Sequence, residues 1–325
     1  MATGNNRVPN AHLGMLFWAL IVGSSFPVVG ALSDGLPPLS LTAIRFAIAA
    51  LAIWPWVRRT ADRWPSLPGL MLYGLMGLSL AGFFGVMFWA AHHTSALLMA
   101  TLYVSVPLLA YLLGRIIGVE RRSVQLTAIL ALGAVGALGI AWAQASGQPD
   151  ELSFGFPEAA FFAGCFASAL YPVLSKWGLK HEWLSGRAET RTFWSLLTGS
   201  VLVAALALIG EAPSQLYQLT FLDGLIIAYL GVFSSGVTFW LSQRATGVLT
   251  PAAVTAYSYL APFVSMLVLF VLEPTRMGWH WLPGSALVVL AIALLLRRDA
   301  NSRAPVPQVT SPRAVSAYLS KGVMS

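Results

Sequence analysis

Long apolar stretches recur along nearly the whole chain and limit what it can fold into. Each is close to the roughly 20 residues that a helix needs to cross about 30 Å of hydrocarbon. Because hydrocarbon offers no partner for a free backbone amide, each stretch must be helical. Ten such stretches cover residues 13–33, 40–57, 68–91, 95–117, 124–143, 157–177, 191–210, 221–241, 248–272 and 278–297. The sequence therefore predicts an all-α integral membrane protein with ten transmembrane helices.

The number and placement of charged residues support this class. Only 10% of the 325 residues are charged, whereas a soluble domain carries about 25%. With ten spans, the connections alternate between the two sides of the bilayer, and all but two of the 19 lysines and arginines fall on one side. By the positive-inside rule, both termini are expected in the cytoplasm. The net charge of +7 then reflects topology, and no basic cluster with interleaved aromatics indicates nucleic-acid binding.

The chain also repeats itself. Residues 85–89 and 236–240 both read Gly-Val-x-Phe-Trp. One proline precedes each copy and another follows it, at similar distances in the two halves. The matching prolines are Pro27 and Pro172, and Pro107 and Pro262. This order predicts a first repeat over residues 1–150, a second over 151–298 and a disordered cytoplasmic tail over 299–325.

The number of spans in each repeat sets how the repeats are related. Five spans are expected per repeat, and five is odd, so the first helices of the two repeats start on opposite sides of the membrane. Two inverted five-helix repeats are a common plan of secondary transporters, with the substrate near the midplane between them.

Several short motifs occur in an order that resembles the EamA-type drug/metabolite transporters. They are residues 35–38 (Gly-Leu-Pro-Pro) with Arg45 and Phe46, residues 93–96 leading to Val106 and Pro107, residues 118–120 (Gly-Val-Glu), 165–176 and 245–262. The resemblance spans about residues 13–297. It implies a ten-helix exporter or exchanger that lies in a bacterial inner membrane and needs neither ATP nor a cofactor. It extends distantly to aromatic amino acid exporters, but their Asn-Tyr-Leu-Trp-Pro run is not matched by residues 103–107.

Arg45 is the sharpest candidate for substrate binding. It lies inside the second span, roughly 8–10 Å below the outer surface at ~1.5 Å per residue. A charge within a span is costly and is usually retained for function, and the planar guanidinium suits a carboxylate or phosphate. The alternative is that Arg45 snorkels outward or caps carbonyl groups of a neighbouring helix.

Four tyrosines near span centres are further candidates. A hydroxyl at that depth needs a partner or a wet cavity. Tyr103, Tyr171, Tyr257 and Tyr259 could stack on a substrate or bind it by hydrogen bonds, and Ser24, three residues before Pro27, is a further candidate for substrate binding.

The prolines inside the spans are candidate hinges. Pro27, Pro107, Pro172 and Pro262 each release a backbone carbonyl and permit bending, and such kinked helices can line a cavity. The alternative is that membrane helices tolerate proline without any such role.

These features favour a secondary transporter of small amphipathic metabolites, such as amino acids, that works by alternating access. A channel or scaffold is the alternative, and an intramembrane enzyme is a weaker one. Residues 77–81 only half resemble a serine-nucleophile motif, and no phosphate-binding loop occurs. The adjacent His92 and His93 have no evident third ligand, so no metal site is expected. The substrate and the oligomeric state stay open.

Overall fold

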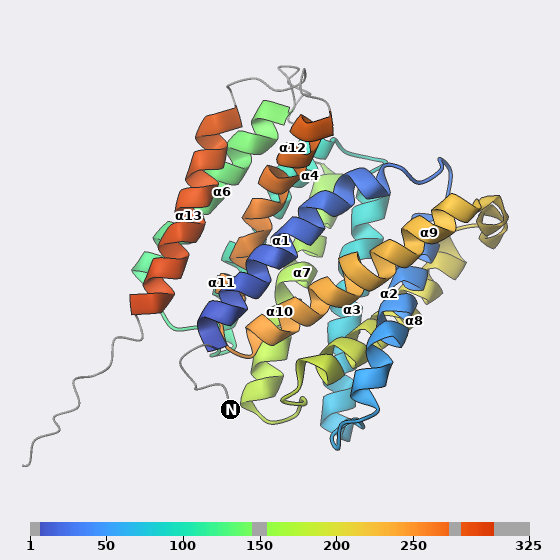
Figure 1. Cartoon of the computed structure of the whole chain (residues 1–325), viewed down its shortest axis with the longest axis horizontal. Coiled ribbons are helices and arrows are strands. Elements are labelled where there is room, and N and C mark those ends of the chain that lie inside the picture. The colour runs from blue at the N-terminus through green and yellow to red at the C-terminus, as the bar shows by residue number, and fades with distance from the viewer. Residues whose placement is uncertain (1–6, 145–154, 273–280, 302–325) are drawn as a thin grey trace, which may run out of the picture.

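A computed structural model describes residues 7–144, 155–272 and 281–301, which form a helical bundle that contains no strand within these ranges (Figure 1). The first half contains α1 (Arg7–Val29), α2 (Pro38–Val57), α3 (Leu67–Ala90), α4 (Ala96–Tyr103), α5 (Val106–Ile116) and α6 (Val124–Gln144). The second half contains α7 (Phe156–Lys180), α8 (Ala188–Gly210), η2 (Pro213–Gln218), α9 (Phe221–Tyr229), η3 (Leu230–Val237), α10 (Thr238–Thr246), α11 (Pro251–Ala256), η4 (Tyr257–Tyr259), α12 (Leu260–Leu272) and α13 (Leu282–Asn301).

The described helices confirm an all-α membrane fold. Nine helical stretches within the described ranges are long and apolar enough to cross a membrane. Three of them are composite, because α4 continues into α5, α9 continues through η3 into α10, and α11 continues through η4 into α12. The last expected span corresponds to α13, which is apolar until Arg297, Arg298 and Asp299 in its final turn.

Contacts between helices follow the order expected of a duplicated chain. The helices α2 and α6 pack against their equivalents α8 and α13, and the fourth span packs through α5 against α11 of the ninth span, its equivalent. The contact of α3 with α7 is matched by that of α10 with α1, and the contact of α5 with α7 by that of α12 with α1. Exchanging the halves therefore preserves these contacts between spans, and Figure 1 shows α6 and α13 side by side at one edge.

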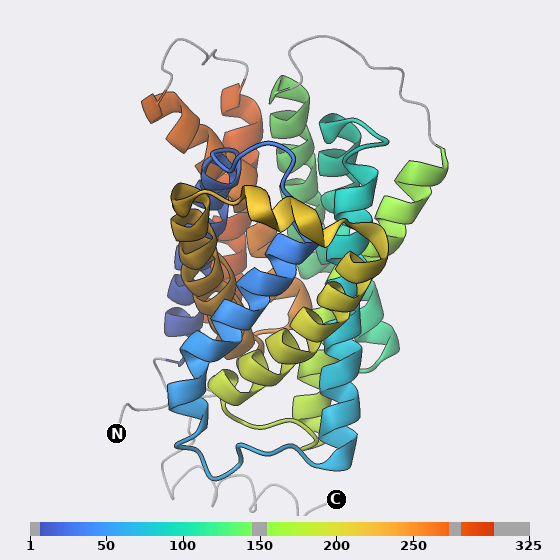
Figure 2. The same ribbon diagram turned by 90° about the vertical axis from the view of Figure 1, so that its right-hand side faces the viewer.

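The two halves run in opposite directions. The start of α1 lies beside the end of α13, since His12 Nε2 is 3.3 Å from Asp299 Oδ2. The end of α3, at the other side of the bundle, meets the start of α7, where the rings of Trp89 and Phe156 are 5.8 Å apart. Figure 2 shows the resulting opposite courses of α1 and α7.

Some helix limits differ from the sequence prediction. Helix α1 begins at Arg7 and not at residue 13, and the eighth span continues to Thr246 and not to residue 241. Helix α13 runs to Asn301, so residues 299–301 belong to a helix and not to the expected tail, while residues 302–325 lie outside the described residues. The predicted spans end where polar residues begin. Several of those polar residues are hydrogen-bonded to other helices, so the helices continue beyond the predicted limits.

The prolines occupy two kinds of position. Pro107 is the second residue of α5 and Pro262 the third of α12, so both directly follow a break in a composite span. Proline lacks an amide hydrogen and leaves a carbonyl four residues earlier without its helical partner. In contrast, Pro27 lies two residues before the end of α1, and Pro172 lies within the continuous helix α7. Their role as hinges stays a prediction.

Glycines allow the closest approach between the halves. A Cβ atom at Gly284 of α13 would lie 2.8 Å from the carbonyl oxygen of Gly136 in α6. A Cβ atom at Gly136 would lie 2.8 Å from the backbone nitrogen of Val288. Only glycine fits at both positions, so these residues fix the distance between α6 and α13.

Candidate functional site

Arg45 of α2 carries a positive charge that no nearby acid among the described residues neutralises. Its Nη2 atom donates to Ser234 Oγ at 3.3 Å and to Ser235 Oγ at 3.4 Å. Its Nε atom is buried and has no hydrogen-bond partner among the described residues. Within the same part of the chain, no carboxylate oxygen lies within 4.0 Å of the guanidinium group. Hydroxyl groups alone compensate a charge poorly, so this site is suited to receive an anion.

The two serines are brought to Arg45 by an unusual helical segment. The element η3 is a π-helix, a wide form that occurs often at functional sites. A Cβ atom at Gly231 would lie 2.7 Å from Ile48 Cγ2, and one at Gly236 would lie 3.6 Å from Ala49 Cα. The two glycines are five residues apart, the hydrogen-bond spacing of a π-helix, and both face α2. The backbone of η3 can therefore approach α2 closely enough to place its hydroxyl groups beside Arg45.

A continuous row of aromatic rings passes through Phe46, the residue after Arg45, and involves five helices. Phe46 of α2 contacts Phe84 of α3 at a centroid distance of 5.3 Å and Phe239 of α10 at 5.8 Å. The row continues from Phe84 through Phe83 to Tyr103 at the end of α4, and from Phe239 to Tyr171 of α7, with centroid distances of 5.1, 5.6 and 5.6 Å. We call these six residues the aromatic row. The row thus includes the residue that follows Arg45 in α2, and its members Phe46 and Tyr171 are buried in the protein.

The predicted tyrosines fall into two groups. Tyr103 is half-buried, Tyr171 shares a hydrogen bond of 2.9 Å with Ser195 Oγ, and both belong to the aromatic row. Tyr257 and Tyr259 are fully buried in a different core cluster formed with α1, α6 and α13. The structure therefore brings Tyr103 and Tyr171 into the row that contains Phe46, the neighbour of Arg45 in α2, and places the other two tyrosines elsewhere.

Local partners account for the remaining predicted side chains. Tyr257 shares a hydrogen bond of 2.8 Å with His12 Nδ1, and Tyr259 donates to the carbonyl oxygen of Val104 at 3.3 Å. Ser24 is half-buried and donates to the carbonyl oxygen of Ile21 in its own helix at 3.0 Å. Among the described residues, no group of three His, Cys, Asp or Glu side chains could hold a metal ion.

Sequence reasoning missed most of the aromatic row and both serines. Phe239 lies in the second copy of the repeated Gly-Val-x-Phe-Trp pattern, which was a usable signal. Ser234 and Ser235 form a polar pair between glycines in an otherwise apolar span, which was a second signal. Phe46 was part of the motif shared with the resembled family, but Phe83 and Phe84 have no such mark, because phenylalanine is common in lipid-facing positions.

Comparison with known proteins gives consistent results. The chain is 28% identical to the probable terminal-alkyne amino-acid exporter of Streptantibioticus cattleyicolor, over 90% of this chain and 96% of that protein. It is 26% identical to the uncharacterized inner membrane transporter YedA of Escherichia coli K12, over 78% of this chain and 80% of that protein. A solved crystal structure with 20% identity superposes with a TM-score of 0.72, covers 90% of this chain and 99% of its own, and shows the fold alone.

A family description matches both halves separately. The model of the EamA-like transporter family covers residues 10–142 and again residues 156–297. The two matches together include most of the chain and divide it close to the predicted limit between the repeats. This protein belongs to the EamA-like transporter family.

Proposed function

We propose that this chain exports or exchanges small amphipathic metabolites that carry an anionic group, amino acids or related compounds, by alternating access. The observation that carries the proposal is the guanidinium group of Arg45, which has no carboxylate partner among the described residues and belongs to the residue that precedes Phe46 of the aromatic row. Arg45 would bind the anionic group, and the row would contact the apolar part of the substrate.

The chemistry of the site supports an anionic substrate with an apolar portion. A carboxylate can accept two parallel hydrogen bonds from a guanidinium group, including one from the unpaired Nε of Arg45. Ser234 and Ser235 can then donate their hydroxyl protons to the same anion. The relative named as a probable amino-acid exporter fits this class of substrate.

The two halves differ in a way that supports alternating access. In the first half, residues 98–105 of the fourth span are all partly exposed. In the second half, residues 251–261 of the equivalent ninth span are all buried except Thr255. A transporter that is open toward one side has one of two equivalent spans exposed and the other buried. If the fourth span became buried and the ninth exposed, the protein would open toward the other side.

We propose that both termini are cytoplasmic, because nearly all lysines and arginines fall on that side. A reporter enzyme that is active only in the periplasm, fused to the C-terminus, is expected to give no activity. The same reporter inserted after Asp34, in the connection between α1 and α2, is expected to be active. The opposite pattern of activities would overturn this topology.

Counterflow in proteoliposomes tests the transport function. Liposomes preloaded with an unlabelled amino acid are expected to accumulate the labelled one transiently, and the rate is expected to saturate with concentration. Liposomes without protein are the control. If no counterflow occurs and the current through the protein rises linearly with substrate concentration, the protein is a channel and the proposal is contradicted.

A further inference from the structure

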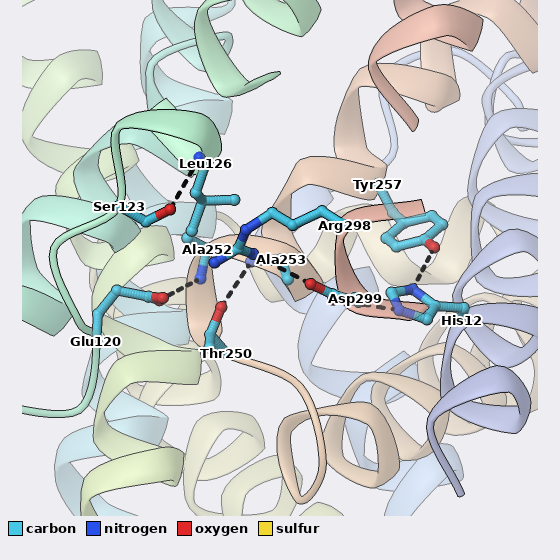
Figure 3. A network of polar contacts seen from close by, with 10 residues as sticks. All are labelled: His12, Glu120, Ser123, Leu126, Thr250, Ala252, Ala253, Tyr257, Arg298 and Asp299. Atoms are coloured by element: carbon cyan, nitrogen blue, oxygen red, sulfur yellow. Dashed lines mark hydrogen bonds and ion pairs between the residues drawn. The ribbon is translucent and has the colours of Figure 1, made fainter. Parts of the chain in front are cut away.

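Two short hairpins at opposite ends of the bundle each meet a glutamate from the other half. Between α3 and α4, Thr94 donates its hydroxyl proton to Glu158 of α7. Between α10 and α11, Thr250 binds the carboxyl group of Glu120, which follows α5. The amide of Ala252 also donates to Glu120 Oε2 at 3.4 Å (Figure 3). Each contact joins the two halves at one end of the transport path.

The position of Glu120 is fixed by the end of α5. Gly118 has a φ of +79°, a backbone conformation that glycine adopts readily. The chain then turns back, and the amides of Val119 and Glu120 donate to the carbonyl oxygen of Gly114 at 2.8 and 2.9 Å. A Cβ atom at Gly114 would lie 3.0 Å from that of Glu120. The turn therefore presses Glu120 between α5 and the hairpin, where it is 8% exposed.

The two glutamates differ in how well they are hydrogen-bonded. Glu158 accepts from Thr94 and from the amide of Gly155 at 2.7 Å. Glu120 accepts a longer bond from Ala252, in addition to its contact with Thr250. A buried carboxylate with few short bonds is costly when charged. The contact at the Glu120 end is therefore the one that a change of protonation can weaken.

Several charged or titratable groups face Glu120, and each has another partner. Lys176 of α7 donates to the carbonyl oxygen of Thr246 at 2.9 Å. Arg298 of α13 binds Asp299 Oδ1 at 3.1 Å. Tyr111 of α5 accepts from the amide of Ser123 at 3.0 Å and donates to its carbonyl oxygen at 3.5 Å.

These neighbours do not neutralise the carboxyl group. Burial, the largest effect, raises the pKa of Glu120 to about 7, and the bonds from Thr250 and Ala252 and the charge of Arg298 offset only part of this. Near neutral pH, Glu120 can therefore change its protonation state while it is buried.

The hairpin itself is held firmly by its own half. Arg191 of α8 donates to the carbonyl oxygen of Gln243 at 2.6 Å, and Lys176 donates to that of Thr246. These cations satisfy carbonyl groups at the end of α10, where the helix dipole is negative. The hairpin should therefore move with the second half, and the contact with Glu120 lies across the boundary between the halves.

We propose that Glu120 is a proton-binding gating residue of the transport cycle. When neutral, it holds the α10–α11 hairpin against the first half, and loss of its proton lets the cytoplasmic end open. The released proton passes to water at the opened cytoplasmic end, and closing takes one up again. The inference rests on the proposed transport function, which supplies the cycle that the gate controls.

The direction of the pH effect follows from the two protonation states. The joined form holds the proton with a pKa of about 7, and an exposed Glu120 would have its ordinary pKa of 4.5. The joined form therefore binds more protons between these values and loses stability as the pH rises from about 4.5 to about 7. Complete linkage would change the ratio of separated to joined forms on the order of a hundredfold over this range. Above pH 7 no further change is expected.

Spin-label distances across the gate test the proposal. In a variant whose sole cysteine is removed by Cys165→Ala, labels are attached after Ile116→Cys in α5 and Val248→Cys in the hairpin. Both positions are exposed and uncharged, which leaves the surroundings of Glu120 intact. Double electron–electron resonance is expected to show mainly a short distance at pH 5.0 and a larger share of a long distance at pH 7.5.

Two further variants test whether Glu120 causes the change of distance with pH. Glu120→Gln is expected to keep the short distance at both pH values, because the amide stays neutral. Glu189→Gln, also at the cytoplasmic end, is expected to behave like the parent protein. A parent protein with the same distances at both pH values, or a Glu120→Gln variant that still responds to pH, would refute the gate. The measurement uses no substrate, so its outcome is independent of the counterflow result, and the parent comparison needs no variant of Glu120.

Discussion

Arg45→Ala is expected to weaken the apparent affinity for the transported anion about ten- to a hundredfold, which corresponds to ~1.5–3 kcal/mol for a hydrogen bond to a charged group. The guanidinium group has hydroxyl groups as its partners and no carboxylate nearby within the described residues, so its removal leaves no acid unpaired. The loss should therefore appear mainly in the concentration that gives half-maximal counterflow.

Two variants serve as controls for Arg45. Arg45→Lys keeps the charge but loses the planar fork, so an intermediate affinity is expected. Arg59→Ala removes an exposed arginine just beyond the end of α2 and should leave the affinity unchanged. If a monodisperse Arg45→Ala protein shows the parent affinity for every transported compound, Arg45 is structural and does not bind substrate.

Arg191→Ala is expected to cause a large loss of stability, of about 3 kcal/mol or more, because it removes three hydrogen bonds from a charged group. The Arg191 side chain is 1% exposed and donates to Gln243 Oε1 at 3.0 Å, to Gln243 O at 2.6 Å and to Ser185 O at 2.6 Å. Its loss would remove a charged donor from each of these oxygen atoms, although Gln243 Oε1 keeps its bond from Ser175 Oγ and Gln243 O its bond from the amide of Gly247. A lower midpoint of thermal unfolding in detergent, followed by tryptophan fluorescence, is the measurement.

Arg187 offers a matched control for this effect. It lies one helical turn before Arg191, is exposed and caps the start of α8 by its backbone, so Arg187→Ala should leave the midpoint nearly unchanged. An equal midpoint for the parent and Arg191→Ala proteins would show that water or neighbouring groups replace all three bonds. Counterflow through a folded Arg191→Ala protein would further separate stability from transport.

The sequence contained most of the information about the spans. A helix that crosses hydrocarbon must be apolar along its length, so the apolar stretches of the sequence locate the spans to within several residues. The positions of Pro107 and Pro262 also indicated where two spans break, because proline removes a helical hydrogen bond in both halves. Arg45 was identifiable because a charge within a span stands out against apolar neighbours.

The partners of these residues were not predictable in the same way. His12 and Tyr257 meet across 245 residues, and Arg45 meets Ser234 across 189. Such contacts depend on how helices from the two halves cross, which residue spacing within one span does not report. The tyrosine hydroxyls therefore looked equally available in the sequence, although Tyr257 and Tyr259 are enclosed by protein.

The π-helical turn in the eighth span changes how the two halves should be aligned. The repeated Gly-Val-x-Phe-Trp pattern lies in the regular helix α3 in its first copy, but its second copy begins in η3 and ends in α10. A wide turn holds more residues than a turn of an α-helix. Residues before the second copy are thus shifted around the helix relative to their counterparts before the first. Aligning the halves by structure then requires a gap at this point, and without it identical letters would be paired with residues on different helix faces.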